Sequence, residues 1–553
     1  MKRLPIGLSD FKTMIEENRY FIDKTLLIKE VAEGSEIILY PRPRRFGKTL
    51  NLSMIKYFYD IRENNRHLFN GLKIEEEESV MKKQGKHPVI YITFKDIKAL
   101  NYNDCMLKIK EEIRRLYNEH IYLLKSEKLN ENEKEFYNSI LNETANVSKY
   151  ENSFKNLIEY LYRYYESKVV LLIDEYDMTI QGAYSYGYYD ELILFIKNLL
   201  SGGLKDNIYL EKAVLTGILR VAKESIFSGL NNIRVASIIS EYSADKFGFT
   251  EEEVVDLMKY YGEEDNIEEV KSWYNGYNFG GNTIYNPWSI LNYADEKILM
   301  PYWVNTSGND MIRELFAHGN SDVKKDLEKL IAGESLNKRV DDNIVYGEIN
   351  EENTLWSFLL MSGYLKYENL KVVNRIAYAD LRIPNEEVIY LYENQIIENW
   401  FQKSRAKHGL ERVLKNLTSG DIDEFRYMFM EFSMSSFSYF DVSGEEPESF
   451  YHAFVLGMMV GLRDEYIIKS NKESGMGRYD ILLIPRDKSR RGIIFEFKKV
   501  NKFEKESMET AMEKAKKQII DRKYESELKE TGIKEIVRLA AVFEGKNVEI
   551  ESF

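Results

Sequence analysis

The chain has 553 residues, of which 44% are hydrophobic and 30% charged, and its formal net charge is −14. This length exceeds what one hydrophobic core normally supports, so it predicts about two to four domains. The 40 Tyr and 28 Phe against 9 Pro exclude a disordered chain, and a single cysteine, Cys105, excludes internal disulfides and thiolate metal clusters. The net charge disfavours broad attraction to nucleic acid or anionic lipid, although a local basic patch can still bind nucleic acid.

The segment that begins Met1-Lys2-Arg3-Leu4-Pro5 has no apolar stretch behind it, which predicts that no signal peptide is present. No run approaches the roughly 18 uninterrupted apolar residues that a membrane span needs. Together with the single cysteine, these features predict a cytoplasmic protein with no membrane partner.

From residue 1 to about 225, short apolar stretches alternate with long amphipathic ones, which is typical of a parallel α/β sheet. We expect strands at residues 37–40, 88–94, 169–173 and 213–216. Residues 101–165 are rich in Lys, Glu, Leu and Tyr at helical spacing and are expected to form helices.

Residues 42–49 read R-P-R-R-F-G-K-T and directly follow the first expected strand. They match the phosphate-binding loop G-x-x-x-x-G-K-[ST], with Arg42 in place of the first glycine. In such a loop Lys48 reaches the β- and γ-phosphates, Thr49 holds Mg²⁺, and the start of the next helix faces the phosphates. Taken alone, Gly47-Lys48-Thr49 leaves open a basic turn that only caps a helix.

A second motif follows the expected strand 169–173, which ends in Asp174 and Glu175. A P-loop ATPase needs such acids, because Asp174 would hold the Mg²⁺ shell and Glu175 would polarise the attacking water. The next expected strand ends at Thr216, where a γ-phosphate sensor would lie. The alternative is a buried strand whose acids merely meet solvent at its edge.

These motifs resemble the signature of bacterial AAA-ATPase-like proteins, which are related to the archaeal and STAND NTPases. The resemblance covers residues 4–300 in blocks at residues 21–25, 40–50, 174–175, 216–217 and 285–289. Relatives read G-P-R-R-x-G-K-T, so Arg42 replaces their glycine in register. Motif and resemblance together assign ATP binding to Arg42, Arg44, Arg45, Gly47, Lys48, Thr49, Asp174 and Thr216.

Arg42 lies between Pro41 and Pro43, which restricts a turn that glycine would make freely. A guanidinium in this position can instead contact phosphate directly and bidentately. We therefore expect NTP binding with altered geometry, and we allow for slow hydrolysis.

The middle region, residues 226–440, is expected to be mainly helical. Residues 273–281 interleave glycine, asparagine and aromatic residues and indicate a tightly turned loop packed against rings. This loop could close over the nucleotide or pack against a helix, and we favour packing. Residues 359–367 indicate a helix end followed by a strand, as in winged-helix modules.

A polar stretch at residues 441–447 is the expected linker to a small α/β domain of residues 441–553. In that domain Asp480 follows a glycine turn and starts an apolar strand, and the next strand contains Glu496 and Lys498. Strand alternation places Glu496 and Lys498 on one face, opposite two phenylalanines. The hairpin can bring Asp480 beside Glu496, so that the carboxylates hold one or two Mg²⁺ ions and Lys498 activates water. A solvated hairpin face is the alternative.

The hairpin resembles the PD-(D/E)-x-K nuclease superfamily, in the branch commonly fused to AAA-ATPase-like domains, over residues 445–540. The resemblance adds Glu448, on the preceding helix, to the metal site. It also matches Glu473 before the glycine turn, and Gln518 and Tyr524 on a later helix. It implies phosphodiester hydrolysis by Glu448, Asp480, Glu496 and Lys498.

Six cations lie near this hairpin, and they form either a local basic surface for phosphate contacts or a solvated charge run. They are Arg486, Lys488, Arg490, Arg491, Lys499 and Lys502. The sequence thus predicts an α/β protein in which an ATP- and Mg²⁺-binding NTPase of residues 1–225 gates a Mg²⁺-dependent nuclease. Its expected partner is nucleic acid, DNA in preference to RNA, and homo-oligomerisation is left open. The family architecture suggests a role in mobile-element or phage conflict. The rival hypotheses are an NTP-dependent signalling or scaffold switch whose nuclease fold binds nucleic acid without cutting it, and an assembly module without catalysis.

Overall fold

The computed structural model describes residues 1–221, 232–304, 321–331, 333–344, 352–392, 407–439, 455, 458–462, 465–470, 473–474, 477–478, 480–501, 506–521, 525–544 and 547–553. Contacts between residues divide the chain into two compact units. The first unit comprises residues 1–307 and 337–388, and the second comprises residues 308–336 and 389–553. The expected middle region, residues 226–440, is therefore divided between the two units.

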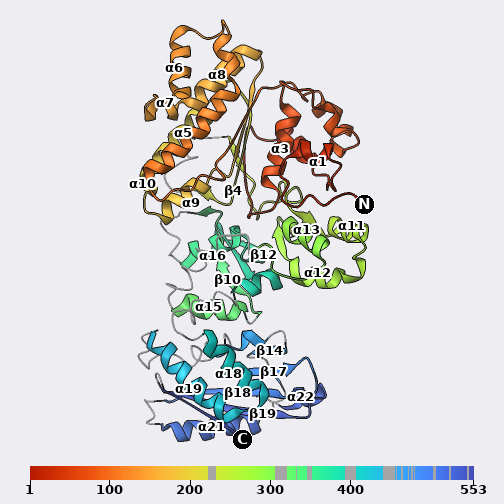
Figure 1. The fold of residues 1–553 in the computed structure, drawn as a ribbon, viewed down its shortest axis with the longest axis vertical. Helices are drawn as coiled ribbons and strands as arrows, with labels where there is room; N and C mark the ends of the chain where they lie inside the picture. Colours follow the sequence, from red (N-terminus) through yellow and green to blue (C-terminus); the bar gives the residue numbers. More distant parts are fainter. Residues whose placement is uncertain are drawn as a thin grey trace. The chain divides into compact units, whose positions relative to one another are not determined.

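A five-stranded parallel sheet lies at the centre of the first unit, with the strand order β2-β3-β4-β1-β6 (Figure 1). Its strands are almost entirely apolar because both faces of a parallel sheet are covered. The four strands expected from the sequence all form, and the ends of each differ from the predicted ends by three residues or fewer. The strands are β1 (Ile37–Pro41), β2 (Val89–Thr93), β3 (Val169–Asp174), β4 (Leu210–Gly217) and β6 (Ile233–Val235).

Helices cover both faces of this sheet, as Figure 1 shows for α1 and α3 on one side and α5, α8 and α10 on the other. The helices expected within residues 101–165 all form and lie on the same side of the sheet as α5, α8 and α10. The helices are α1 (Phe11–Glu16), α2 (Leu26–Glu33), α3 (Lys48–Tyr59), α4 (Glu78–Met81), α5 (Tyr102–Glu119), α6 (Glu131–Leu141), α7 (Val147–Glu151), α8 (Ser153–Tyr165), α9 (Met178–Ser185) and α10 (Tyr189–Leu204).

The rest of the first unit combines helices with two small three-stranded sheets, of strand orders β7-β9-β8 and β10-β13-β12. The expected helix end followed by a strand is present, because α16 ends at Met361 and β12 begins at Lys366. A short parallel pair joins β5 to β11. The elements are β5 (Arg220–Val221), β7 (Phe249–Thr250), α11 (Glu251–Tyr261), α12 (Ile267–Tyr274), β8 (Tyr277–Phe279), β9 (Asn282–Tyr285), α13 (Pro287–Glu296), β10 (Leu336–Arg339), β11 (Asn343–Ile344), α16 (Glu352–Met361), β12 (Lys366–Val373) and β13 (Ile376–Arg382).

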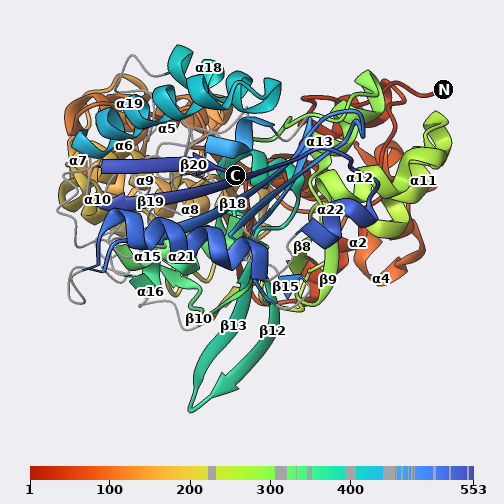
Figure 2. The same ribbon diagram turned by 90° about the horizontal axis from the view of Figure 1, so that it is seen from below.

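The second unit is built on a mixed sheet of order β14-β17-β18-β19-β20, in which only β18 and β19 are parallel. Figure 2 shows α18 and α19 on one face of this sheet and α21 on the other. The elements are α15 (Ser321–Ile331), α18 (Lys407–Ser419), α19 (Ile422–Tyr439), β14 (Tyr466–Ser470), β15 (Glu473–Ser474), β16 (Gly477–Arg478), β17 (Ile481–Pro485), β18 (Gly492–Lys499), α21 (Met508–Asp521), α22 (Glu525–Glu530), β19 (Ile536–Glu544) and β20 (Asn547–Ser552).

Helices α18 and α19 precede the expected linker at residues 441–447, yet they belong to the core of this C-terminal sheet. Their residues Leu417, Phe425 and Phe429 are buried in one cluster with Phe495 and Phe497 of β18. Residues 441–447 themselves lie outside the described residues. Within the part of the chain that the structure describes, no helix is both long and apolar enough to cross a membrane.

Candidate nucleotide and nuclease sites

Three motifs that are distant in the sequence meet at the carboxyl edge of the first sheet. Strand β4 lies between β1 and β3, so Thr216 at its end lies between the P-loop and Asp174. The Thr216 hydroxyl donates to Asp174 Oδ1 at 2.7 Å, and the Thr49 hydroxyl donates to Asp174 Oδ2 at 2.8 Å. Asp174 has no exposed surface. The structure therefore brings Thr49, Asp174 and Thr216 together, as the motifs predicted.

The loop before α3 has the backbone conformation that its glycine permits. Gly47 has a φ of +82° and precedes the first turn of α3, and a Cβ on it would meet no atom within 4 Å. Arg45, which also has a positive φ, is exposed and lies over the Trp288 ring at 4.2 Å. Arg44 donates to Gln181 Oε1 at 3.1 Å. The loop thus presents the amino end of a 12-residue helix, which attracts anions.

Lys48 is held inside the loop. Its ammonium donates to the carbonyl oxygens of Arg42 at 2.9 Å and Pro43 at 3.0 Å, and the residue is 4% exposed. Burial lowers the pKa of Lys48, and the charges of Glu175 and Asp174 oppose this effect. Since an ammonium has three N–H donors, these two carbonyls account for two of them.

Arg42 does not have the role that the sequence suggested. Its guanidinium is fully buried and donates to the carbonyl oxygens of Pro41, Ala236 and Ser243. It lies 5.0 Å from the Phe247 ring and 5.3 Å from the Phe279 ring. Burial lowers its pKa to about 10, so the group is charged at neutral pH. A guanidinium held in this way cannot also contact a phosphate, which corrects the expectation of a direct bidentate contact.

We expect Arg42→Gly, which restores the glycine of the common pattern, to weaken the protein. Removing a buried charged donor from carbonyl oxygens costs about 2–4 kcal/mol of unfolding free energy. Nucleotide affinity should not increase in this variant, because the Arg42 guanidinium bonds to carbonyl oxygens of the protein and not to phosphate. Denaturant unfolding and nucleotide titration of the variant would measure both quantities. Higher affinity at unchanged stability would contradict this role.

Two acids follow Asp174, and only the first of them was predicted. The Glu175 amide donates to the Thr216 hydroxyl at 3.2 Å, which fixes the acid beside β4. Asp177 is 2% exposed and accepts from the amides of Ile218 at 2.8 Å and Leu219 at 2.9 Å. Burial raises the pKa of Asp177 to about 6. Its carboxylate holds the turn after β4, and its position three residues beyond Asp174 was the available sequence signal.

The aromatic segment of residues 273–289 packs against the P-loop itself. Phe46 lies edge-on to Tyr277, with ring centroids 5.0 Å apart, and both rings are buried. The side chains of Trp303 and Asn286 donate to the Arg44 carbonyl oxygen at 3.1 Å and 3.5 Å. The segment therefore packs on the P-loop as well as on the neighbouring helices.

A buried glutamate anchors the same region. Glu387 has no exposed surface and accepts from the Ser289 hydroxyl at 2.8 Å and from the Trp303 amide at 2.5 Å. Burial raises its pKa to about 7. No sequence pattern indicated this residue, since its partners lie far from it along the chain.

The C-terminal hairpin places its two predicted acids side by side. Strand β17 pairs Ile481 with Phe495, so Asp480 comes opposite Glu496 at the next position. The Phe497 amide donates to Asp480 Oδ2 at 2.7 Å, which draws this carboxylate to the strand beside Glu496. The predicted pairing of the two carboxyl-bearing residues across the hairpin is thus present.

The two faces of β18 differ as the alternation predicted. Phe495 and Phe497 join the core under α18 and α19, whereas Glu496 alternates with them and is also fully buried. The opposite face of the sheet includes Ile494 and Ala540 and is covered by helices that include α21. Gln518 lies on α21. Because Glu496 is fully buried, it does not lie on a solvated face of the hairpin.

Lys498 is half-buried at the end of the same strand. It belongs to a charged group with Glu506, whose pKa is lowered first by the Lys514 ammonium, 2.7 Å away, and also by the charge of Lys498. Glu448, Tyr524 and Lys502 lie outside the described residues. In the described ranges, no group of three or more His, Cys, Asp or Glu side chains is arranged to hold a metal.

The basic turn of the hairpin lies away from these acids. Asp480 and Pro485 are five residues apart, or about 17 Å along a strand. Arg490 pairs with Glu465, and Arg491 pairs with Glu535 at 2.8 Å. Part of the expected basic surface is therefore neutralised. Arg486 and Lys488 are exposed in the turn.

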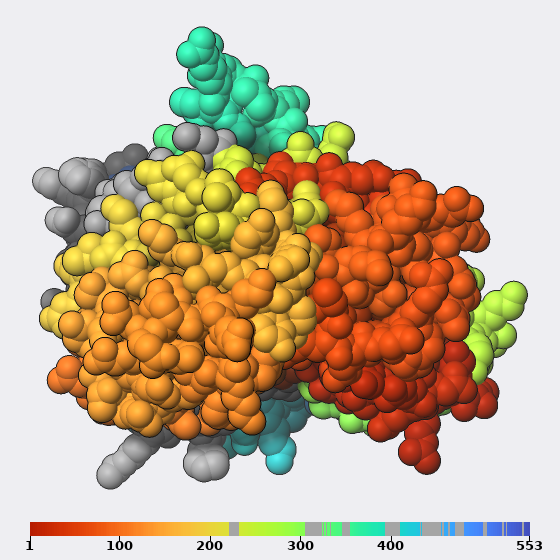
Figure 3. Space-filling view, turned by 90° about the horizontal axis from the view of Figure 1, so that it is seen from above, coloured from red at the N-terminus to blue at the C-terminus, as the bar shows by residue number. Residues whose placement is uncertain are grey.

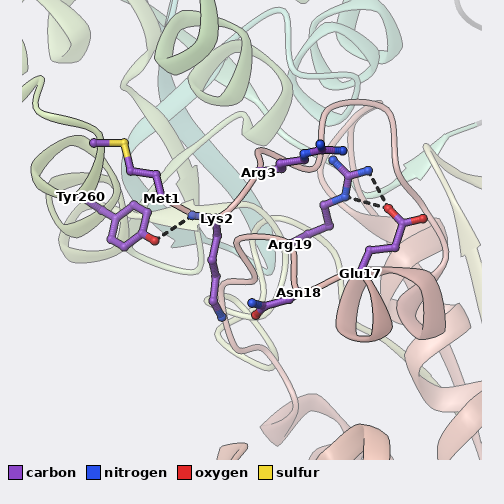
Figure 4. A pocket seen from close by; sticks show the side chains of 7 residues that line it. All are labelled: Met1, Lys2, Arg3, Glu17, Asn18, Arg19 and Tyr260. Carbon is purple, nitrogen blue, oxygen red and sulfur yellow. Dashed lines mark hydrogen bonds and ion pairs between the residues drawn. The ribbon is translucent and has the colours of Figure 1, made fainter.

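A surface cavity of about 660 Å³ lies near the start of the chain, apart from either predicted site (Figure 4). Arg19 lines it and donates twice to Glu17 Oε2, and the Lys2 amide donates to the Tyr260 hydroxyl. None of its lining residues belongs to the P-loop or the hairpin.

The fold and sites together define a P-loop NTPase joined to a nuclease-like domain. A family model described as a predicted AAA-ATPase matches residues 5–227, and a PD-(D/E)XK nuclease superfamily model matches residues 446–553. The chain therefore contains an N-terminal AAA-ATPase-like domain and a C-terminal domain of the PD-(D/E)XK nuclease superfamily, as the motifs indicated.

One curated protein and one solved structure also match this chain. A protein of Azotobacter chroococcum mcd 1, named an uncharacterized protein in the vnfD 5' region, is 27% identical over 389 residues, which cover 70% of this chain and 68% of that protein. A STAND protein with a tetratricopeptide repeat sensor from Pyrococcus horikoshii is 12% identical, with a TM-score of 0.26. That match covers 80% of this chain and 54% of the other, so the chain spans about half the length of the STAND protein. A TM-score this low supports no functional argument.

Proposed function

We propose that this protein binds Mg²⁺-ATP at the P-loop and cuts nucleic-acid phosphodiester bonds at the C-terminal hairpin, with nucleotide state gating the cut. The observation that carries the proposal is Glu496, a fully buried carboxylate that lies opposite Asp480 on the neighbouring strand. An acid in that position is explained by a metal site better than by packing.

The nucleotide site has the groups that ATP and Mg²⁺ require. The third N–H of Lys48 would donate to a phosphate oxygen, and the Thr49 hydroxyl with Asp174 would hold the ion. Bound Mg²⁺ would neutralise charge that develops on the phosphates. Glu175 would orient the attacking water, and the Thr216 hydroxyl would sense the γ-phosphate.

At the nuclease site, Asp480 and Glu496 lie opposite each other on adjacent strands, and their carboxylate oxygens would hold a metal ion. Such an ion would supply a nucleophilic water and stabilise the phosphate charge. Lys498, on the strand of Glu496, would position that water and stabilise charge on the reacting phosphate. Glu448 completes the proposed ligand set on the strength of the family resemblance alone.

A cleavage assay tests the proposal. Purified full-length protein would be incubated with single- and double-stranded DNA and RNA, with Mg²⁺ or Mn²⁺, and with or without ATP. We expect metal-dependent cutting of DNA that changes with ATP and is abolished by chelation. Cutting that persists with excess EDTA would show a contaminant or a different site. Cutting that ignores ATP, in a protein that binds ATP, would refute the gating.

The second candidate function is an NTP-dependent signalling or scaffold switch whose nuclease fold binds nucleic acid without cutting it. It is favoured by Arg42, which replaces the first glycine of the P-loop pattern. It predicts binding without cleavage under every metal condition. Our proposal further includes a cytoplasmic location, gating that involves homo-oligomers, and a role in mobile-element or phage conflict, which rest on analogy.

A further inference from the structure

The hairpin formed by β12 and β13 ends in a fully exposed tip, residues 369–375. All seven residues of this segment are exposed. Figure 2 shows the hairpin projecting far beyond the helices of the first unit, and the same teal segment stands out from the surface in Figure 3. The tip includes Val372, which is 71% exposed, and Val373, which is 53% exposed. Exposed apolar side chains on a protruding element indicate a contact surface better than a packing role.

The tip is positively charged in an otherwise acidic chain. Residues 369–379 contain Lys371 and Arg375 and no acid, whereas the whole chain has a net charge of −14. The nearest acids of the hairpin lie at its base. Glu368 lies 3.1 Å from Lys366, and Asp380 accepts from Asn337 and Asn369 at 2.8 Å and 2.9 Å. The charge of Lys371 is one of the causes that lower the pKa of Asp380, after the hydrogen bonds from Asn337 and Asn369, whereas Arg375 lies farther along the hairpin, in its turn.

The turn holds one cation at the outermost position. Val373 pairs with Ile376, so the loop has two residues, Asn374 with a φ of +51° and Arg375 with a φ of +67°. Both residues of such a turn are left-handed, and glycine is the usual second residue because a side chain there strains the backbone. An arginine in this position suggests that the guanidinium has a function that outweighs the strain.

We propose that the β12–β13 tip binds double-stranded DNA by entering a groove, with Lys371 and Arg375 on phosphates and Val372 and Val373 on the groove wall. A two-stranded β-ribbon fits the major groove of B-DNA, which is about 12 Å wide, whereas the major groove of A-form RNA is too narrow. The inference takes nucleic acid as partner from the proposed function. It adds a DNA contact on the NTPase unit, separate from the nuclease hairpin.

Binding of a labelled 20-base-pair duplex, measured by fluorescence anisotropy in EDTA, tests this surface without cleavage. The variants are Arg375→Gly and the pair Lys371→Gln with Arg375→Gly, in the full chain. Glycine suits the positive φ, so Arg375→Gly should melt no lower than wild type. The matched control is Lys82→Gln with Lys205→Gln, which removes two exposed cations from other elements.

We expect the double variant to bind at least about tenfold more weakly, with the control unchanged. The slope of log affinity against log salt should fall by about 0.9 for each lost phosphate contact. If the double variant binds the duplex with an affinity within twofold of wild type, this inference is wrong, but the proposed function is not affected. If wild type binds no nucleic acid, the partner in the proposed function fails as well. If Val372→Ser with Val373→Ser changes the oligomeric state but not DNA binding, the tip joins copies of the chain and the inference is also wrong.

Discussion

Glu496→Gln is expected to reduce phosphodiester cleavage roughly a thousand-fold, because a metal's charge stabilisation is worth several kcal/mol and each 1.36 kcal/mol changes the rate about tenfold. The fold should survive the change. A buried amide is less costly to desolvate than a buried carboxylate, so the variant should melt at or above the wild-type temperature. The measurement is the initial rate of cutting at saturating Mg²⁺, together with thermal unfolding.

The control for this experiment lies on the same hairpin. Asp487 is exposed in the turn between β17 and β18 and accepts from Ser489, so Asp487→Asn makes the same kind of change far from the proposed site. It should cut at the wild-type rate. Asp480→Ala should behave like Glu496→Gln. Equal loss in Asp487→Asn would mean that the hairpin responds to any carboxylate change, and the site assignment would not stand.

Lys48→Ala is expected to weaken ATP binding by about 10- to 100-fold, since a hydrogen bond to a charged group contributes roughly 1.5–3 kcal/mol. The titration uses full-length protein with Mg²⁺-ATP. Nuclease activity in the variant should lose its dependence on ATP if nucleotide state gates the cut. Equal affinities in wild type and variant would mean that residues 42–49 are a basic turn and not a nucleotide site.

Two further variants separate charge from loop support. Lys48 also supplies donors to the Arg42 and Pro43 carbonyl oxygens, so Lys48→Gln keeps a donor there while removing the charge. It too should lose affinity, with less effect on unfolding. Lys56→Ala removes a lysine from the same helix two turns further on, and it should bind ATP like wild type.

The role of Arg42 depends on contacts that the local sequence does not reveal. An arginine in a P-loop, flanked by prolines, looks like a ligand for phosphate, because guanidinium and phosphate are complementary. The structure turns it away from the loop, toward the carbonyl oxygens of Ala236 and Ser243 and between two aromatic rings. Those partners are about 200 residues away in the chain, and no local pattern connects them to Arg42.

By contrast, the sequence by itself predicted the residues of both candidate sites, because the ends of parallel strands and the alternation along a strand follow from local patterns. Parallel strands end at a common edge, so Thr49, Asp174 and Thr216 could be expected to meet there. Alternation along a strand placed Glu496 opposite its flanking phenylalanines, and one hairpin brought Asp480 beside it. Only the tertiary structure decided the rest: the burial of Arg42 and Glu387, the packing of the aromatic segment on the P-loop, the neutralised arginines of the nuclease hairpin, and the projection of the β12–β13 tip. These features depend on contacts between distant segments, and local residue patterns carry no information about such partners.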